Sequence, residues 1–222
     1  MRIPQPYGQR SSVGISEAKI KYFLAYEGRR TEYMYFRGIH INRNEVGIDS
    51  LVEIIPIEHD SKTSSNPLNL YNEAKEALDN CDNYFPEAGD QFCLIVDRDR
   101  KSFSEIQYEE LLKYEKNGNI NLIVSNPCFE FWLLLHFKKC SDIAPELIFE
   151  NKKVGNRTFV ENLLKNCLGG SYSKSRLKFE QFKNHINKAI ANSRTYATEP
   201  GELKNKIGTN VGLLIERMQQ HQ

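Results

Sequence analysis

Three acidic side chains stand where predicted strands end. Glu27 follows the apolar run Ile20–Tyr26, and Asp97 and Asp99 follow the run Gln91–Val96. The two aspartates are two residues apart, which puts both side chains on one face of an extended chain. If the strands are parallel neighbours, the three carboxylates lie together and repel one another unless a cation separates them. Oxygen-only ligation suits Mg²⁺ or Mn²⁺, which act on phosphate esters, so the pattern indicates a phosphoryl-transfer centre.

The same residues also have an ordinary structural interpretation. Asp is common in the turn after a strand, and Glu27 could be a solvated strand end. Each motif alone favours that interpretation. Together they favour a site, because both follow apolar strands at equivalent places in an α/β succession, where ligand sites concentrate. Gly28 also allows a tight turn beside Glu27.

Four strand-then-helix units in series position these carboxylates. The predicted strands are Ile20–Tyr26, Leu51–Ile57, Gln91–Val96 and Ile120–Val124, and the helices that follow begin near Thr31, Asn66, Ser104 and Asn126. Parallel strands need crossover connections, usually helices, so the series predicts an α/β fold with a mainly parallel four-stranded sheet flanked by helices. Pro56 predicts an edge position for the second strand.

The chain divides into three predicted regions. Residues 1–18 contain two prolines, two glycines and a serine pair, and we expect a flexible N-terminal arm there. Residues 19–140 form the predicted α/β core. From about residue 141 the strand signal fades, and residues 141–222 are predicted to form a basic helical subdomain that packs on the sheet. Its predicted helices lie near Pro145–Phe149, Arg157–Cys167, Ser175–Ser193 and Asn210–Gln219.

Charge is unevenly distributed along the chain, although the formal net charge is only +1. Residues 1–150 carry 17 basic and 24 acidic side chains, whereas residues 151–222 carry 13 basic and 5 acidic ones. This pattern is expected if carboxylates bind metal cations in one part of the protein and Lys or Arg side chains bind polyanions in another. Solvated helix faces would produce it equally well.

Composition excludes several classes of protein. The hydrophobic share of 40% is too high for a disordered chain, and the charged share of 27% is too high for a membrane protein. The N-terminus has no apolar leader, and the longest unbroken apolar stretch, Phe131–Leu135, is far too short to span a bilayer, so we expect a cytoplasmic protein. The cysteines and histidines lack the spacing of a zinc site or of a Ser-His-Asp triad. His136, in an apolar run, is expected in the core.

Further charged residues adjoin the predicted carboxylate site. Glu130 lies in the first turn of a helix that Asn126 could cap, with Pro127 at its first position. It is either placed there by the helix dipole or serves as an additional metal ligand. Several Arg and Lys residues could bind nucleic-acid phosphates. Those in the turns could equally balance the charge of nearby acids, and those in the C-terminal region could belong to an ordinary amphipathic helix. These Arg and Lys residues are Arg29, Arg30, Arg98, Arg100, Arg176 and Lys178.

Three segments carry a resemblance to a known family. The successions KYFLAYEGRRTEYMYF, FCLIVDRDR and LIVSNPCFEFWLLLHF resemble the RloB-like family of bacterial proteins associated with phage defence and abortive infection, over about residues 18–140. The resemblance implies a Toprim-like Rossmannoid core. It also implies that Glu27 is the general acid/base and that Asp97 and Asp99 hold Mg²⁺ or Mn²⁺.

The resemblance has two further implications. Tyr172-Ser173-Lys174 is similar to a family pattern in which a Tyr and a Lys precede a long helix. This makes Lys174 a candidate for stabilising the charge that develops on the phosphorus. The alternative is that Lys174 is a surface residue that binds nothing. The family is thought to act beside an AAA-type ATPase. Residues 169–175 come nearest to a P-loop in this chain but lack the Gly before the Lys, so ATP would have to come through a partner.

Three functional hypotheses follow. The first is a Mg²⁺-dependent nuclease of anti-phage defence that cleaves DNA or RNA, with tRNA among the candidate substrates, under the control of a partner ATPase. The second is a non-catalytic docking or regulatory subunit of a defence ATPase complex, in which the carboxylates are a vestigial or structural metal site. The third, nucleotidyl transfer at the same metal centre, would need a nucleoside triphosphate, and no separate nucleotide-binding motif is visible.

Overall fold

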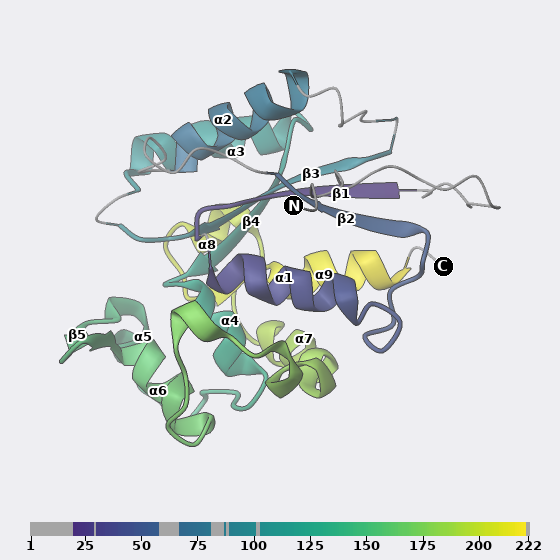
Figure 1. The fold of residues 1–222 in the computed structure, drawn as a ribbon. Helices are drawn as coiled ribbons and strands as arrows, with labels where there is room; N and C mark the ends of the chain where they lie inside the picture. The colour runs from purple at the N-terminus through teal and green to yellow at the C-terminus, as the bar shows by residue number, and fades with distance from the viewer. Residues whose placement is uncertain are drawn as a thin grey trace, which may run out of the picture.

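A central sheet with helices on both faces organises the protein (Figure 1). The structure is a computed structural model, and it describes residues 20–28, 30–57, 67–80, 87, 89–100 and 103–220. The predicted N-terminal arm and Arg29 lie outside these residues. No helix within the described ranges has the length and apolar character needed to cross a membrane.

The sheet has five strands, one more than the sequence predicts. In spatial order they are β2 (Val52–Pro56), β1 (Ile20–Tyr26), β3 (Gln91–Asp97), β4 (Asn121–Asn126) and β7 (Gly208–Thr209). The first four are parallel, as expected for strand-then-helix units, and β2 lies at the edge that Pro56 indicates. The prediction of four strands is wrong because β7, antiparallel to β4, is only two residues long and carries no hydrophobic period.

The two faces of the sheet support two separate cores. Alternation along β1 sends Phe23 and Ala25 to one face and Tyr22, Leu24 and Tyr26 to the other. The first core is covered by α2 (Pro67–Asn80) and α3 (Glu105–Lys116), which lie above the sheet in Figure 1. Leu203 of the short α8 (Pro200–Leu203) also belongs to this core. Ser104 begins α3 with a full capping box, as its position predicts.

The second core is larger because a further layer of helices packs beneath it. Helices α1 and α9 lie beneath the sheet, and α4, α6 and α7 lie below them (Figure 1). Their bounds are α1 (Thr31–Ile41), α4 (Phe129–Leu135), α6 (Phe159–Cys167), α7 (Ile186–Ser193) and α9 (Val211–Gln220). All seven residues of α4 are buried, since the helix contacts α6, α7 and β4 on different sides. This explains the unbroken apolar run in its sequence.

A small polar network is enclosed within this larger core. The Tyr35 hydroxyl lies 3.0 Å from His136 Nε2, and His136 Nδ1 lies 3.1 Å from the Trp132 carbonyl oxygen. Burial lowers the pKa of His136 to about 3, so the ring is neutral at physiological pH. The prediction that His136 is a hydrogen-bonded core residue is confirmed.

The segment between α6 and α7 differs from its prediction. Instead of one helix over Ser175–Ser193 there are three 3₁₀ turns followed by α7. The turns are η1 (Lys174–Arg176), η2 (Phe179–Gln181) and η3 (Lys183–His185). The Phe179 ring packs so closely on α1 that a Cβ at Gly38 would collide with it, so the chain follows the surface of α1 rather than forming a helix of its own. Arg176 and Lys178 consequently do not lie on one helix with Lys183 and Lys188.

The C-terminal third is also joined to the sheet by side chains. Asn210 Oδ1 accepts a 2.7 Å bond from the Val124 N–H, and Asn210 Nδ2 donates a 2.9 Å bond to the Leu122 carbonyl. The Asn126 side chain donates a 2.7 Å bond to the Leu203 carbonyl of α8. Asn126 therefore ends β4 and does not cap α4, contrary to prediction; Cys128 is the N-cap residue. Because these bonds hold the end of β4, they also fix the start of α4.

Candidate active site

Glu27 and Asp97 lie at the carboxyl ends of adjacent strands, β1 and β3. The Glu27 N–H bonds to the Ile95 carbonyl at 2.9 Å and continues the β1–β3 ladder, and Glu27 Oε2 accepts a 2.9 Å bond from the Asp97 N–H. Burial raises the pKa of Glu27; the bond from Asp97 opposes that shift and the charge of Asp99 adds to it. The parallel sheet thus brings the two carboxylates together, as the succession of units predicts.

Asp97 connects the sheet to α4. Its Oδ1 accepts a 2.8 Å bond from the Phe129 N–H at the first residue of that helix, where the helix dipole favours negative charge. Burial nevertheless raises the pKa of Asp97 well above its ordinary value, and three neighbouring carboxylates raise it further. They are Glu32, Glu27 and Glu130. Asp97 is therefore at the centre of the acidic group.

Glu32 belongs to the same group, although no motif in the sequence singles it out. It lies in the first turn of α1 with 6% of its surface exposed, and its carboxylate packs over Gly28 so closely that a Cβ there would collide with it. Burial, together with the charges of Glu130 and Glu27, raises the pKa of Glu32 to about 7. The available signal was its place in the first turn of a helix that starts at the same sheet edge as Glu27.

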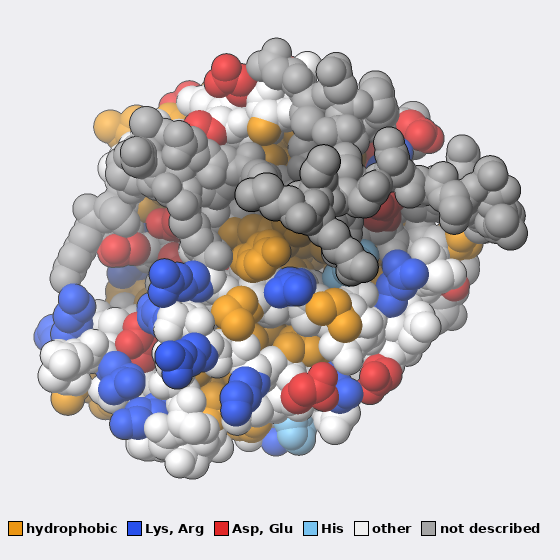
Figure 2. All heavy atoms as spheres, in the orientation of Figure 1, with side chains coloured by type: hydrophobic (Ala, Val, Ile, Leu, Met, Phe, Trp, Pro, Cys, Tyr) orange, Lys and Arg blue, Asp and Glu red, His pale blue; other side chains and the backbone are white. Residues whose placement is uncertain are grey.

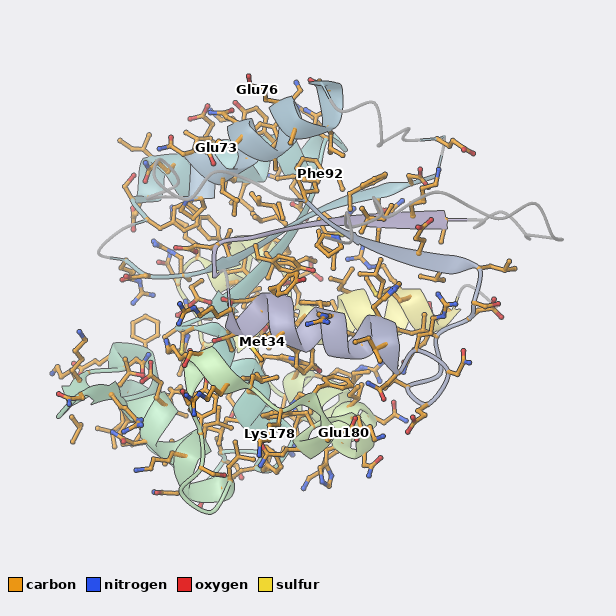
Figure 3. The ribbon with its side chains drawn as sticks, viewed as in Figure 1. Met34, Glu73, Glu76, Phe92, Lys178 and Glu180 are labelled. Atoms are coloured by element: carbon orange, nitrogen blue, oxygen red, sulfur yellow. The ribbon has the colours of Figure 1, made fainter. Side chains whose placement is uncertain are left out.

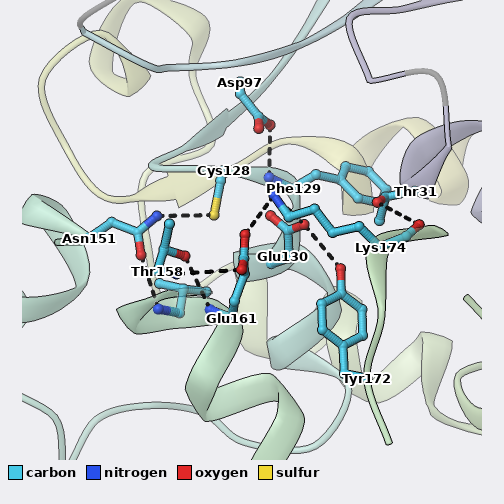
Figure 4. Close-up of polar contacts among 11 residues, drawn as sticks. Thr31, Asp97, Cys128, Phe129, Glu130, Asn151, Thr158, Glu161, Tyr172 and Lys174 are labelled. Atoms are coloured by element: carbon cyan, nitrogen blue, oxygen red, sulfur yellow. Dashed lines mark hydrogen bonds and ion pairs between the residues drawn. The ribbon is translucent and has the colours of Figure 1, made fainter. Parts of the chain in front are cut away.

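Glu130 completes the group from the first turn of α4. It is buried, and its Oε1 accepts a 3.0 Å bond from the Tyr172 hydroxyl and lies 3.0 Å from Lys174 Nζ (Figure 4). Burial, followed by the charge and the bond of Glu130, raises the pKa of Tyr172, so the hydroxyl remains a donor. The structure therefore brings Glu130 and Lys174 to the carboxylates that end β1 and β3. We name this acidic group, Glu27, Glu32, Asp97 and Glu130, the carboxylate cluster.

Lys174 is held between two acids from different helices. Its Nζ lies 2.7 Å from Glu161 Oε1 in addition to its contact with Glu130 (Figure 4). Burial lowers the pKa of Lys174, but the two carboxylates outweigh this and raise it. Thr31 donates a 3.4 Å bond to the Lys174 carbonyl, so the backbone is held as well. The Glu161 N–H donates to the side chain of Thr158, the N-cap residue of α6, in a capping box. The role of Glu161 in the site was not predicted, because a Glu three residues after an N-cap is typical of an ordinary capping box.

Asp99 and the predicted arginines occupy different environments around the cluster. Asp99 is exposed beyond the end of β3 and acts on Glu27 through its charge. Arg98 is only 3% exposed: it donates bonds to the Phe103 and Lys204 carbonyls at 2.6 and 3.1 Å. The expectation that Arg98 is an exposed turn residue is therefore wrong, because the guanidinium supplies donors to buried carbonyls.

The remaining basic residues are exposed. Arg30, Arg100, Arg176 and Lys178 all have exposed side chains. Lys178 lies on the segment below α1, across the sheet from Glu73 and Glu76 of α2 (Figure 3). In Figure 2, blue side chains gather at the lower left and centre, over the part of the molecule where Figure 1 shows α5, β5 and α6. This face can attract a polyanion.

The cluster fits a hard divalent cation by its donor chemistry. All its donors are oxygens, and the bonds made by Glu27 and Asp97 use Oε2 and Oδ1, which leaves Oε1 and Oδ2 available among the described residues. As the side chains stand, no three His, Cys, Asp or Glu residues in the described ranges surround a common ion position. Ligation would therefore require side-chain rotation at this sheet edge.

Comparison with known proteins identifies the family. The family model described as RloB-like protein matches residues 22–218, a range that contains the carboxylate cluster, Lys174 and most of α9. No curated protein and no solved structure matches the chain. Because the match covers nearly the whole chain, this protein belongs to the RloB-like family.

Proposed function

We propose that this protein is a metal-dependent nuclease that hydrolyses phosphodiester bonds of DNA or RNA. One observation carries the proposal: four separate segments bring carboxylates to one edge of the sheet, and the pKa values of Glu27, Glu32 and Asp97 are all raised there. Crowded, desolvated carboxylates destabilise a fold and are typical of sites where they perform chemistry.

The residues take separate roles in this proposal. Mg²⁺ or Mn²⁺, when bound, supplies Lewis-acid stabilisation of the phosphoryl oxygens. Asp97 and Asp99 would hold it, with Glu27 and Glu130 as the neighbouring carboxylates. Because burial raises the pKa of Glu27 above its ordinary value, this side chain is suited to accept the proton of an attacking water and to return one to the leaving oxygen.

Positive charge is available beside these acids. The Lys174 side chain is 52% exposed, so its ammonium can contact a phosphate from the solvent side while the two buried acids hold it. Arg30, Arg176 and Lys178 are exposed on nearby segments and would bind the flanking backbone phosphates. The basic surface then binds the substrate backbone, and the phosphodiester bond to be broken lies at the carboxylate cluster.

The biological setting is part of the same proposal. We place the nuclease in anti-phage defence in the cytoplasm, where an AAA-type ATPase partner controls it. Membership of the RloB-like family supports this setting, and so does the lack of a complete P-loop in the sequence, since ATP must then be used by a second protein.

A second candidate function is a docking or regulatory subunit that does no chemistry. The ion pairs of Lys174 with Glu130 and Glu161 favour it, because an internal ammonium already neutralises part of the cluster. In that case the carboxylates would maintain the attachment of the 172–176 segment to α4 and α6, and the activity would belong to the ATPase.

An assay of the purified chain, with and without the ATPase, separates the two candidates. A nuclease should cleave labelled DNA or RNA with Mg²⁺ or Mn²⁺, and Glu27→Gln should abolish cleavage while the protein stays folded. A docking subunit should stay inert in every combination. Glu76→Gln is the matched control, since this exposed acid on α2 lies across the sheet from the cluster and its substitution should leave the rate unchanged (Figure 3).

A further inference from the structure

Arg100 and Phe149 form a stacked pair on the surface beside the carboxylate cluster. The guanidinium carbon of Arg100 lies over the Phe149 ring, 3.7 Å from its centre. Arg100 is exposed and Phe149 is half-buried near the end of α5 (Pro145–Glu150). A guanidinium so close to the ring centre lies against the ring face, so the pair presents a flat cationic surface to solvent.

Both members of the pair are anchored to the cluster. Arg100 is three residues after Asp97, which limits the separation of their Cα atoms to about 11 Å. Phe149 is two residues before Asn151, whose side chain donates to Cys128 Sγ at 3.4 Å and accepts from the Val160 N–H at 2.9 Å (Figure 4). Cys128 in turn precedes Phe129, the residue that donates to Asp97. The stacked surface is therefore held at the border of the candidate active site.

The surroundings of the pair favour a polynucleotide. Leu147 and Val154 are 49% and 61% exposed, and the hairpin of β5 (Lys153–Val154) and β6 (Arg157–Thr158) adds exposed Lys153. Lys152, just before the hairpin, lies 2.8 Å from Glu150. Apolar surface interleaved with cations suits a chain of bases and phosphates. Arg98 provides the contrast, because its guanidinium also lies over aromatic rings but is buried and bonded to carbonyls.

We propose that Arg100 and Phe149 form a stacking platform for one unpaired nucleobase of a single-stranded polynucleotide, next to the phosphate that enters the carboxylate cluster. The inference rests on the proposed nuclease function and names its substrate class. Unpaired bases stack on aromatic rings and on guanidinium planes, whereas the faces of bases within a duplex are covered by their neighbours. A duplex would gain nothing from the platform unless a base were flipped out.

Binding measured without cleavage tests the platform directly. Fluorescence anisotropy with a chelator present compares a single-stranded oligonucleotide with a series of abasic versions, each lacking one base. For the wild-type protein, one abasic position should weaken binding about tenfold, within the range of one base–aromatic stack. Phe149→Leu keeps an apolar side chain of similar size but lacks the ring, and it should bind the intact strand about tenfold more weakly and be indifferent to the abasic position.

Two controls keep this outcome interpretable. Ile41→Ala alters an exposed apolar residue at the far end of α1, outside the proposed platform, and should leave the abasic effect intact. Arg100→Lys retains the charge but loses the plane, so it should reduce the abasic effect while preserving the salt dependence of binding. Thermal unfolding of each variant shows whether the fold is kept.

The results separate this inference from the proposed function. If Phe149→Leu binds intact and abasic strands as the wild type does, the platform is wrong even where the wild type cleaves nucleic acid. If the abasic effect depends on Phe149 but no metal supports cleavage with or without the ATPase, the platform stands and the nuclease proposal fails. If the wild type binds duplex and single strands equally with no abasic effect, the platform is overturned.

Discussion

Helices α1 and α4 each contribute to two buried polar groups with opposite character. Their first turns contribute Glu32 and Glu130 to the carboxylate cluster. Tyr35 of α1 and His136, the residue that follows α4, form the neutral network beside Trp132. In the network the Tyr35 hydroxyl and both ring nitrogens of His136 have hydrogen-bond partners, and burial keeps the imidazole uncharged. In the cluster like charges are held together. The same two helices therefore stabilise the fold at one end and tolerate repulsion at the other.

This difference indicates that the carboxylate cluster lowers the stability of the fold, whereas the neutral network does not. Buried polar groups normally have partners, so the neutral network needs no functional explanation. Adjacent buried carboxylates with raised pKa values do need one, because removing their charge should stabilise the protein. Substitutions in the two groups should consequently have opposite effects on stability.

The largest expected effect is on activity. Asp97→Asn removes the central carboxylate and should lower the metal-dependent cleavage rate by on the order of a thousandfold. The amide cannot carry the negative charge that a divalent cation requires, yet it can still accept the bond from Phe129. Initial rates at saturating Mg²⁺ check the loss, and thermal unfolding should show a stability equal to or above that of the wild type. A variant that cleaves normally would contradict the assigned role.

The next effect is on the pH dependence of stability. The pKa of Glu32 is about 7 in the folded protein, against an ordinary value of 4.5 for a solvated glutamate, so the folded protein holds this proton more tightly than the unfolded chain does. The contribution to stability is present below about pH 4.5 and is lost as pH rises to 7, by about 3 kcal/mol in total.

Glu32→Gln should remove that dependence. Denaturant unfolding with a chelator present, from pH 5 to pH 8, should show a steep decline in the free energy of unfolding for the wild type and a shallower one for the variant. Since Mg²⁺ would favour the charged carboxylates, its addition should restore wild-type stability at pH 8. Parallel curves for the two proteins would show that Glu32 does not titrate in this range.

A smaller change is expected in the neutral network. Tyr35→Phe removes one partner of the buried His136 ring nitrogen and should lower the free energy of unfolding by about 2 kcal/mol. The loss should be nearly constant from pH 5 to pH 8, because burial lowers the pKa of His136 to about 3, below that range. Urea unfolding at both pH values measures it, and a stabilised variant would break the contrast between the two groups.

The smallest effect concerns the ion pairs of Lys174. Glu161→Gln keeps the cap of α6 but removes one of the two charges beside the ammonium, and it should cost less than about 1 kcal/mol, since that ammonium is half exposed. The cost should shrink in high salt. Glu180→Gln, which removes an exposed acid paired with the partly buried Lys183, provides the comparison for an ion pair outside the cluster.

Much of the sheet could be predicted from the sequence, because its strands are apolar runs separated by turn residues. Strand β1 has the predicted bounds Ile20–Tyr26, and the meeting of Glu27 with Asp97 follows once β1 and β3 are parallel neighbours. Strand β7 could not be predicted, because its pairing depends on contacts across more than 80 residues of chain rather than on a local period.

The parts of the candidate active site that the sequence did not reveal all look like ordinary local signals. A Glu in the first turn of a helix indicates dipole stabilisation, so Glu32 and Glu161 do not stand out. Helix α1 begins at Thr31 as predicted, but Arg30 is its N-cap residue, and the Thr31 hydroxyl donates to the Lys174 carbonyl. These roles depend on tertiary packing, which cannot be read from the spacing of residues along the chain.

The amide of Asn210 has a consequence for how this protein stays separate from other chains. Together with β7 it covers the exposed side of β4, because its main-chain N–H also bonds to the Val124 carbonyl. At the opposite side of the sheet, Pro56 lacks the N–H that an incoming strand would need. One edge of the sheet is thus covered by a side chain that makes strand-like hydrogen bonds, and the edge strand at the other side has one position that cannot donate to an added strand.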